Sequence, residues 1–459
     1  MMKKKGILFL AGLIGISGTA FSQAQNPECM TNLSVFGEHA KVKNYDAAYE
    51  PWKMVFDNCP ELHPATYVYG ERILKDKIGK SEGAEQEELV NTLMSMYDKE
   101  LEYFPKRYSK ANVLAKKALL MYDQKTAEGS EIFAVLDDAF QNDRANFSNP
   151  KALYLYFSLM VDEYDAGNKD LQQVFDTYDA VNERIDEEMA DLSKVLDEYV
   201  AKEEAGETLD AKSKQSFSNA KINTESYGKI SSSIDAKLGD LADCENLIPL
   251  LEKNFEAKKN DAQWLRRSAG RMDGKDCSDD PMFIKLVEAL HQVEPSSRSA
   301  YYLGVLNDKK GNSAEALKYY NESVSLETDT YKKANTLFKI GVKYKNAGQK
   351  TTAYKYFKQV LDVQPSNGKA YLQIAALYAG SANECGATPF EKRAVYWKAA
   401  QMARKAGQVD PSVKSHAAQT AASYEGRAPG KQDIFSSGMA GKTIQFNCWI
   451  GGSITVPNI

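Results

Sequence analysis

The sequence predicts an all-α protein in which helix pairs stack as repeats into a solenoid, with a long central helical hairpin and a small C-terminal β-hairpin cap. A pattern of small and aromatic residues recurs along the chain, and apolar residues in the middle follow at three- and four-residue steps. β-prone residues gather only near the end. At 459 residues, with 43% hydrophobic and 26% charged side chains, the chain exceeds one ordinary core and can bury a continuous apolar stripe.

Residues 1–24 have the features of an export signal. Lys3, Lys4 and Lys5 precede an apolar stretch that ends at Phe21, and small residues that suit a cleavage site follow. The stretch is short and rich in glycine, which favours a cleaved signal peptide over a permanent anchor, and no other segment is apolar enough to span a bilayer. We expect an exported protein, periplasmic or otherwise in the cell envelope, with no integral membrane span in the mature chain.

Residues 25–168 are expected to form degenerate helical repeats. The pattern there reads Gly37, Ala48, Trp52, Val55 and Pro60, with one residue deleted, and Gly70 falls where the next repeat requires it. A small residue at such a position lets two antiparallel helices approach closely, an aromatic side chain fills the remaining gap, and proline ends the second helix.

Residues 169–243 are predicted to form a long amphipathic helical hairpin. Apolar residues recur at helical steps from Leu171 to Tyr199, and the same steps return from Tyr227 to Leu241 after a polar stretch that follows Gly206. We favour the interpretation that these are elongated helices packed into the solenoid. The alternative is a projecting arm that grips a client protein.

Residues 244–430 contain the clearest repeats. Two segments between Ser297 and Pro365 match position for position, with Gly304, Gly311, Ala316 and Tyr320 in the first and Gly341, Gly348, Ala353 and Phe357 in the second. In these residues the chain resembles the tetratricopeptide family. Less regular copies continue on both sides, and the downstream copy has an insertion that carries Cys385.

Residues 431–459 are expected to cap the last repeat. The segments from Thr443 to Ile450 and from Ser453 to Val456 are β-prone, and Gly451-Gly452 between them predicts a two-residue hairpin turn. A solenoid needs a cap because its last helix pair otherwise exposes an apolar face.

Six cysteines, an even number in a chain predicted to be exported, indicate disulfides. On the predicted helix layout, Cys29 and Cys59 bracket the first antiparallel pair, and Cys244 and Cys277 bracket a later one. Cys385 in the insertion is then left for Cys448 in the cap. We predict the bridges Cys29–Cys59, Cys244–Cys277 and Cys385–Cys448.

The sequence argues against catalysis, a metal site or a cofactor. Residues 436–443 come one residue short of a phosphate-binding loop and lead into a β-prone segment instead of a helix. The four histidines are scattered, no two cysteines have the C-x-x-C spacing, and the net charge of -5 disfavours nucleic acid as a partner. We predict a protein that is not an enzyme and whose partners are other proteins.

The resemblance to tetratricopeptide repeats implies a partner-binding groove along the first helices. The positions that face this groove in the family correspond here to Tyr301, Val305, Phe338, Val342 and Leu372. Family members that clamp a chaperone's C-terminal carboxylate have lysine, asparagine and arginine at such places, so this chain departs from them. Its aromatic and apolar residues predict an extended or helical apolar segment as ligand. The alternative is that the chain's own insertion or neighbouring helices fill the groove.

The stretch from Ala370 to Ala379, Cys385, the helix around Ala394 to Lys398 and the terminal Cys448-Trp449-Ile450 resemble exported tetratricopeptide-repeat proteins of Bacteroidota type, a largely uncharacterised group. This resemblance implies a scaffold or adaptor of the bacterial cell envelope that binds envelope or secretion components through segments held in its groove. A second hypothesis is an ATP-independent, holdase-like periplasmic chaperone that uses the central hairpin as an arm.

Overall fold

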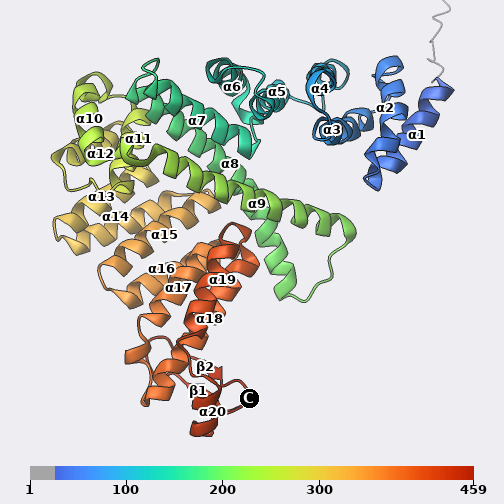
Figure 1. Ribbon diagram of the computed structural model, residues 1–459. Helices are drawn as coiled ribbons and strands as arrows, with labels where there is room; N and C mark the ends of the chain where they lie inside the picture. The colour runs from blue at the N-terminus through green and yellow to red at the C-terminus, as the bar shows by residue number, and fades with distance from the viewer. Residues whose placement is uncertain (1–25, 459) are drawn as a thin grey trace, which may run out of the picture. The chain divides into compact units, whose positions relative to one another are not determined.

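The computed structural model describes residues 26–458, so the predicted export signal at residues 1–24 lies outside the described residues. The described part contains twenty α-helices, four short 3-10 helices and one two-stranded sheet (Figure 1). The predicted all-α, repeat-type fold is confirmed. The chain divides into two compact units, and the boundary between Leu120 and Met121 falls within helix α5 (Lys110–Gln124).

The first unit contains two complete helix pairs and the start of α5. The pairs are α1 (Pro27–Lys41) with α2 (Tyr45–Asn58), and α3 (Ala65–Ile78) with α4 (Gly83–Tyr103). Trp52 is fully buried between them, and its indole N–H donates to the Thr66 carbonyl at 2.7 Å. A Cβ atom at Gly70 would overlap this indole, so the glycine predicted from the repeat pattern lies where the helices come closest.

The second unit begins with the helices that lead into the central hairpin. These are α6 (Gly129–Asp143), η1 (Arg144–Asn146), α7 (Pro150–Asp165), α8 (Leu171–Glu204), α9 (Ala211–Leu238) and η2 (Gly239–Ala242). Helices α8 and α9 fill most of the range predicted as a hairpin. The Tyr178 hydroxyl on α8 donates to Asp235 on α9 at 2.7 Å, and the Tyr227 hydroxyl on α9 donates to the Ser148 carbonyl before α7. Polar contacts therefore tie the hairpin to the rest of the unit.

Consecutive helix pairs follow the hairpin (Figure 1). Helix α10 (Cys244–Lys258) leads into them. The pairs are α11 (Ala262–Gly274) with α12 (Pro281–Val293), α13 (Ser297–Lys309) with α14 (Ser313–Leu326), α15 (Thr330–Asn346) with α16 (Lys350–Val363), and α17 (Gly368–Ala379) with α18 (Pro389–Val409). The short η3 (Ala382–Glu384) lies within the last pair, and η4 (Pro411–Val413) and α19 (Lys414–Glu425) follow it. A Cβ atom at Gly304 would lie 2.5 Å from the Tyr320 ring, and one at Gly341 would lie 2.6 Å from the Phe357 ring. The two pairs therefore pack by the glycine-and-aromatic contact that the repeat pattern predicts.

The C-terminal segment differs from the predicted hairpin in two ways. A short helix, α20 (Lys431–Ser437), precedes it, and the strands are only β1 (Thr443–Gln445) and β2 (Ser453–Thr455), paired antiparallel. The prediction of a two-residue turn at Gly451-Gly452 is wrong, because β1 ends at Gln445 and β2 begins only at Ser453. Cys448 is held by Cys385, and the Trp449 indole N–H donates to the Ser381 hydroxyl at 3.2 Å, so both residues are drawn toward the end of α17.

All six cysteines are paired, in the three combinations that the sequence predicts. Cys29 and Cys59 have Cα atoms 6.4 Å apart, Cys244 and Cys277 5.7 Å, and Cys385 and Cys448 5.3 Å. The chain-entropy model gives each bridge roughly 3.5 to 4.5 kcal/mol of stabilisation for loops of this length. The bridges fasten helix ends in both units. Among the described helices, none is long and apolar enough to cross a membrane.

Candidate partner-binding groove

The first helices of successive pairs in the second unit, α11, α13, α15 and α17, form what we call the inner row. Helix α8 lies along this row and makes polar contacts with it at separated points. Asp179 pairs with Arg271 at 2.7 Å and Glu183 with Arg267 at 2.7 Å, both on α11. Further along, Asp197 accepts the Ser366 backbone N–H at 2.8 Å, just before α17. The chain therefore occupies its own groove with α8.

The α8 residues that make these contacts fall on one helical face. Asp179, Glu183 and Asp186 follow at steps of four and three, and Asp197 and Glu204 are seven residues apart. Glu204 reaches Lys405 on α18, with 3.7 Å between the carboxylate and the ammonium. We call this set of five acidic residues and its basic partners the α8 seam. It joins an acidic stripe on α8 to cations on the repeats and, at Asp197, to the Ser366 backbone N–H.

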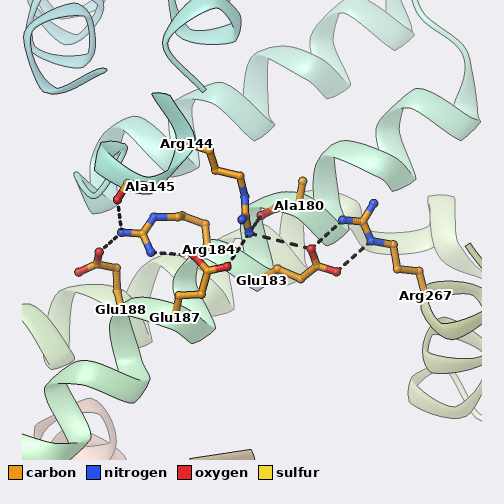
Figure 2. A network of polar contacts seen from close by, with 8 residues as sticks. All are labelled: Arg144, Ala145, Ala180, Glu183, Arg184, Glu187, Glu188 and Arg267. Carbon is orange, nitrogen blue, oxygen red and sulfur yellow. Dashed lines mark hydrogen bonds and ion pairs between the residues drawn. The ribbon is translucent and has the colours of Figure 1, made fainter. Parts of the chain in front are cut away.

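A polar network continues the α8 seam toward η1 (Figure 2). Glu183 contacts Arg267 on one side and Arg144 on the other, with an Arg144 nitrogen 3.9 Å from its carboxylate. The Arg144 guanidinium also pairs with Glu187 at 3.0 Å. Arg184, which is nearly buried, donates to the Ala145 carbonyl at 2.9 Å and pairs with Glu187 and Glu188. One turn of α8 is thereby fixed to both η1 and α11.

The carboxyl groups of the α8 seam respond differently to their surroundings. Burial raises the pKa of the Asp179 carboxyl to about 6, although the charges of Arg271 and Arg267 act in the opposite direction. Burial would also raise the pKa of Glu183, but the hydrogen bonds and charge of Arg267 outweigh it and hold that pKa below its ordinary value. The Arg271 guanidinium also lies over the Phe175 ring, 4.8 Å from its centroid.

The five residues predicted to line the groove do not form an open apolar surface. Tyr301 and Val305 are buried, and the Tyr301 hydroxyl donates to Asp273 at 3.2 Å. Phe338, Val342 and Leu372 are half-buried, and the Phe338 ring packs against Phe357 with centroids 5.6 Å apart. These side chains therefore contribute chiefly to packing between repeats. Sequence reasoning missed the charged residues of the α8 seam, although their helical spacing could have been noticed.

An open cavity of about 650 Å³ remains between α8 and the helices α13 and α15. Charged and polar side chains supply most of its lining, including Asp186 from α8, Arg298 from α13 and Lys339 from α15. Within residues 26–458, no group of three or more histidine, cysteine, aspartate or glutamate side chains is placed to hold a metal ion.

Comparison with known proteins gives relatives for part of the chain. No family model matches. A photosystem I assembly protein, Ycf3 of Cyanophora paradoxa, is 30% identical over 135 residues, which cover 26% of this chain and 78% of that protein. The Ycf3 protein of Rippkaea orientalis is 29% identical over 136 residues, with the same coverage.

Solved structures of low sequence identity also align with the chain. Human IFIT1, in a dimer with m7Gppp-AAAA, is 14% identical, with 79% of this chain and 76% of that chain covered at a TM-score of 0.33. A tetratricopeptide repeat protein from Parabacteroides merdae is 11% identical, with 68% and 98% covered at a TM-score of 0.25. The glycine-and-aromatic pattern of the helix pairs and the kinship with the Cyanophora protein identify the family: the chain belongs to the tetratricopeptide-repeat proteins.

Proposed function

We propose that this protein is a scaffold of the bacterial cell envelope that binds segments of other proteins along its helical repeats. The observation that carries the proposal is the position of α8: the inner row already accommodates a long helix and fixes it through side-chain contacts at separated points. Repeat solenoids present extended surfaces of this kind to protein partners. Because α8 occupies the inner row, a partner segment would bind the exposed side chains beside α8, again through contacts on successive repeats.

The relatives support an assembly role in general terms. The Ycf3 proteins are named for assembly of photosystem I. From that name we carry over only the idea of a protein that brings components of a complex together. The holdase alternative has less support, because it needs a free arm, and α8 is tied to η1 and α11 by ion pairs.

Export to the envelope is supported by two features. The N-terminal residues have the lysine-then-apolar pattern of a signal peptide. All six cysteines are paired in disulfides, which persist in oxidising compartments. Cell fractionation tests this part: the protein should be released with the periplasmic or envelope fraction, and thiol alkylation before reduction should label no cysteine. A cytoplasmic, fully alkylated protein would overturn it.

Site-specific photo-cross-linking in cells tests the scaffold itself. A photoreactive residue at Lys332, at the edge of the cavity beside the inner row, is expected to capture a reproducible set of proteins identified by mass spectrometry. The matched control is Lys358 on α16, which is also exposed. Capture at position 332 and much less at 358 is expected. Absence of any co-purifying protein, or equal capture at both positions, would overturn the proposal.

A further inference from the structure

The cavity between α8 and the inner row lies where the α8 seam opens. On one side of it Glu183 is fixed to Arg267, and on the other Asp197 is fixed to the Ser366 backbone N–H. Between these two anchors α8 stands away from α13 and α15 and leaves about 650 Å³. This volume lies in the range of small-molecule sites, which is roughly 300 to 1,000 Å³.

Most acidic residues around the cavity already have partners. Glu294 pairs with Arg266 at 3.0 Å, Asp191 with Lys194 at 2.8 Å, and Glu187 with Arg144 and Arg184. Glu327 and Asp329 accept backbone N–H groups at the start of α15. These carboxylates are therefore satisfied by the protein.

Two cations of the cavity are not matched in this way. Arg298 and Lys339 are both exposed to the cavity, and in the described part of the chain neither has a carboxylate within ion-pair distance. Asp186 on α8 faces both cations and Lys369 as well, while Glu183 also acts on Arg298 and Asp273 on Lys339. Glu183 and Asp273 are already paired with Arg267 and Lys343, so Asp186 is the carboxylate left to these cations. The Lys339 ammonium lies above the Tyr301 ring, 5.6 Å from its centroid, which leaves its hydrogen-bond donors free for a ligand.

A buried hydroxyl lines the same cavity. Tyr302 is 1% exposed, and its hydroxyl lies beside the Arg298 guanidinium, so the ligand would not contact the phenol itself. The Tyr302 hydroxyl instead helps to hold Arg298 at the cavity wall. Burial raises the pKa of Tyr302 to about 12, so the phenol is a neutral hydrogen-bond donor near pH 7.

We propose that this cavity binds a small molecule that carries an anionic oxygen group, a carboxylate or a phosphate, held by Arg298 and Lys339. Guanidinium and ammonium groups form charge-assisted hydrogen bonds with such oxygens. The site lies beside the surface proposed for partner binding, since Lys332 stands at the edge of both. Asp186 weakens ligand binding, because its carboxylate competes with the ligand for the same cations.

Calorimetric titration of the full mature chain with succinate, inorganic phosphate and sulfate tests the proposal. Saturable binding of at least one probe is expected, and the preference between succinate and phosphate shows which oxyanion the site takes. Arg298→Gln and Lys339→Gln should each weaken binding by about 10- to 100-fold, the effect of losing one charge-assisted hydrogen bond. Tyr302→Phe, which removes the hydroxyl beside Arg298, should weaken it less, by about 5-fold.

The most informative variant in this titration is Asp186→Asn. It should tighten ligand binding by about 10-fold, because it removes the competing negative charge. A misfolded variant cannot produce such a gain. Lys358→Gln, an exposed lysine on α16, is the matched control and should leave affinity unchanged. No saturable binding by either the native chain or Asp186→Asn, or equal affinity in the native chain and Arg298→Gln, would overturn the proposal.

Discussion

The helix pairs of the repeat stack and the α8 seam are held by different physics within the same unit. In the pair α15 and α16, a glycine backbone meets an aromatic ring with no space for one more carbon atom. In the α8 seam, charged side chains meet at separated points and leave a cavity between them. Close apolar packing resists salt and pH, whereas ion pairs respond to both. The unit therefore combines closely packed helix pairs, which we call the frame, with an inner surface held by charges, the α8 seam.

The largest effect is expected from removing an aromatic ring of the frame. Phe357→Ala should lower the free energy of unfolding of the second unit by about 3 to 5 kcal/mol, because the ring is fully buried against Gly341 and Phe338. Urea denaturation followed by circular dichroism measures this. Phe435→Ala is the matched control: that ring is 77% exposed, and its loss should change stability by less than about 0.5 kcal/mol. Equal effects of the two substitutions would mean that burial of the Phe357 ring does not stabilise the helix pair.

Adding one carbon atom to the frame should have the next largest effect. Gly341→Ala places a Cβ 2.6 Å from the Phe357 ring, and the overpacking should destabilise the unit by about 1 to 3 kcal/mol. Gly274, also helical, has open space around its Cβ position. Gly274→Ala should therefore be neutral or stabilise by up to about 1 kcal/mol through helix propensity. Opposite signs for these two alanines are the expected result, and equal signs would argue against the close approach.

The α8 seam should show a pH dependence that the frame lacks. The folded-state pKa of Asp179 is about 6, above its ordinary value of 3.8, so the folded state prefers the neutral acid. Its contribution to stability is complete below about pH 4 and is lost as pH rises through about 6. Relative to Asp179→Asn, the native chain should lose about 1 to 3 kcal/mol between pH 4 and pH 7. In the control Asp191→Asn, which removes an exposed pair with Lys194, the free energy of unfolding should change with pH as it does in the native chain. If the native chain instead gains stability relative to Asp179→Asn over this range, the pKa of Asp179 is not raised.

The smallest effect is expected at the outer end of the α8 seam. Glu204 and Lys405 lie 3.7 Å apart, and the Glu204 side chain is largely exposed. Glu204→Gln should cost at most about 0.5 kcal/mol at low salt and nothing at 1 M salt. Denaturation at the two salt concentrations measures the difference. A cost that persists at high salt would mean that packing, not charge, holds this end of α8.

Local patterns made much of the fold predictable. The helix pairs could be predicted because each glycine-and-aromatic contact lies within one repeat, where the sequence spacing determines the geometry. These contacts are Gly304 with Tyr320 and Gly341 with Phe357. The cysteine pairings followed from the same layout, since helix ends that meet are known once the helices are. The turn before Ser453 was misjudged because a distant residue, Cys385, holds Cys448 away from the sheet.

The site was less predictable because it depends on which helix lies against the inner row. Glu183 and Asp186 on α8 read in the sequence like any solvated helix face. Only the fold brings Arg267 and Arg298 opposite them. The residues predicted for the groove were assigned from family positions, and in this chain α8 takes the place in which a partner was expected. Helical spacing shows that charged residues share one face of a helix, but it does not show which other helix that face contacts.

The α8 seam joins residues that lie far apart in the sequence, and this separation affects the order of folding. Asp179 meets Arg271 across 92 residues, and Asp197 meets Ser366 across 169. Contacts within a repeat close short loops and form early, whereas contacts at such separations form late. Helix α8 precedes the helices of the inner row in the chain, so this face of α8 finds its partners only after those helices have formed. Refolding of the full chain should accordingly show a late, salt-sensitive phase, and Glu183→Gln should slow it while leaving the early helical phase unchanged.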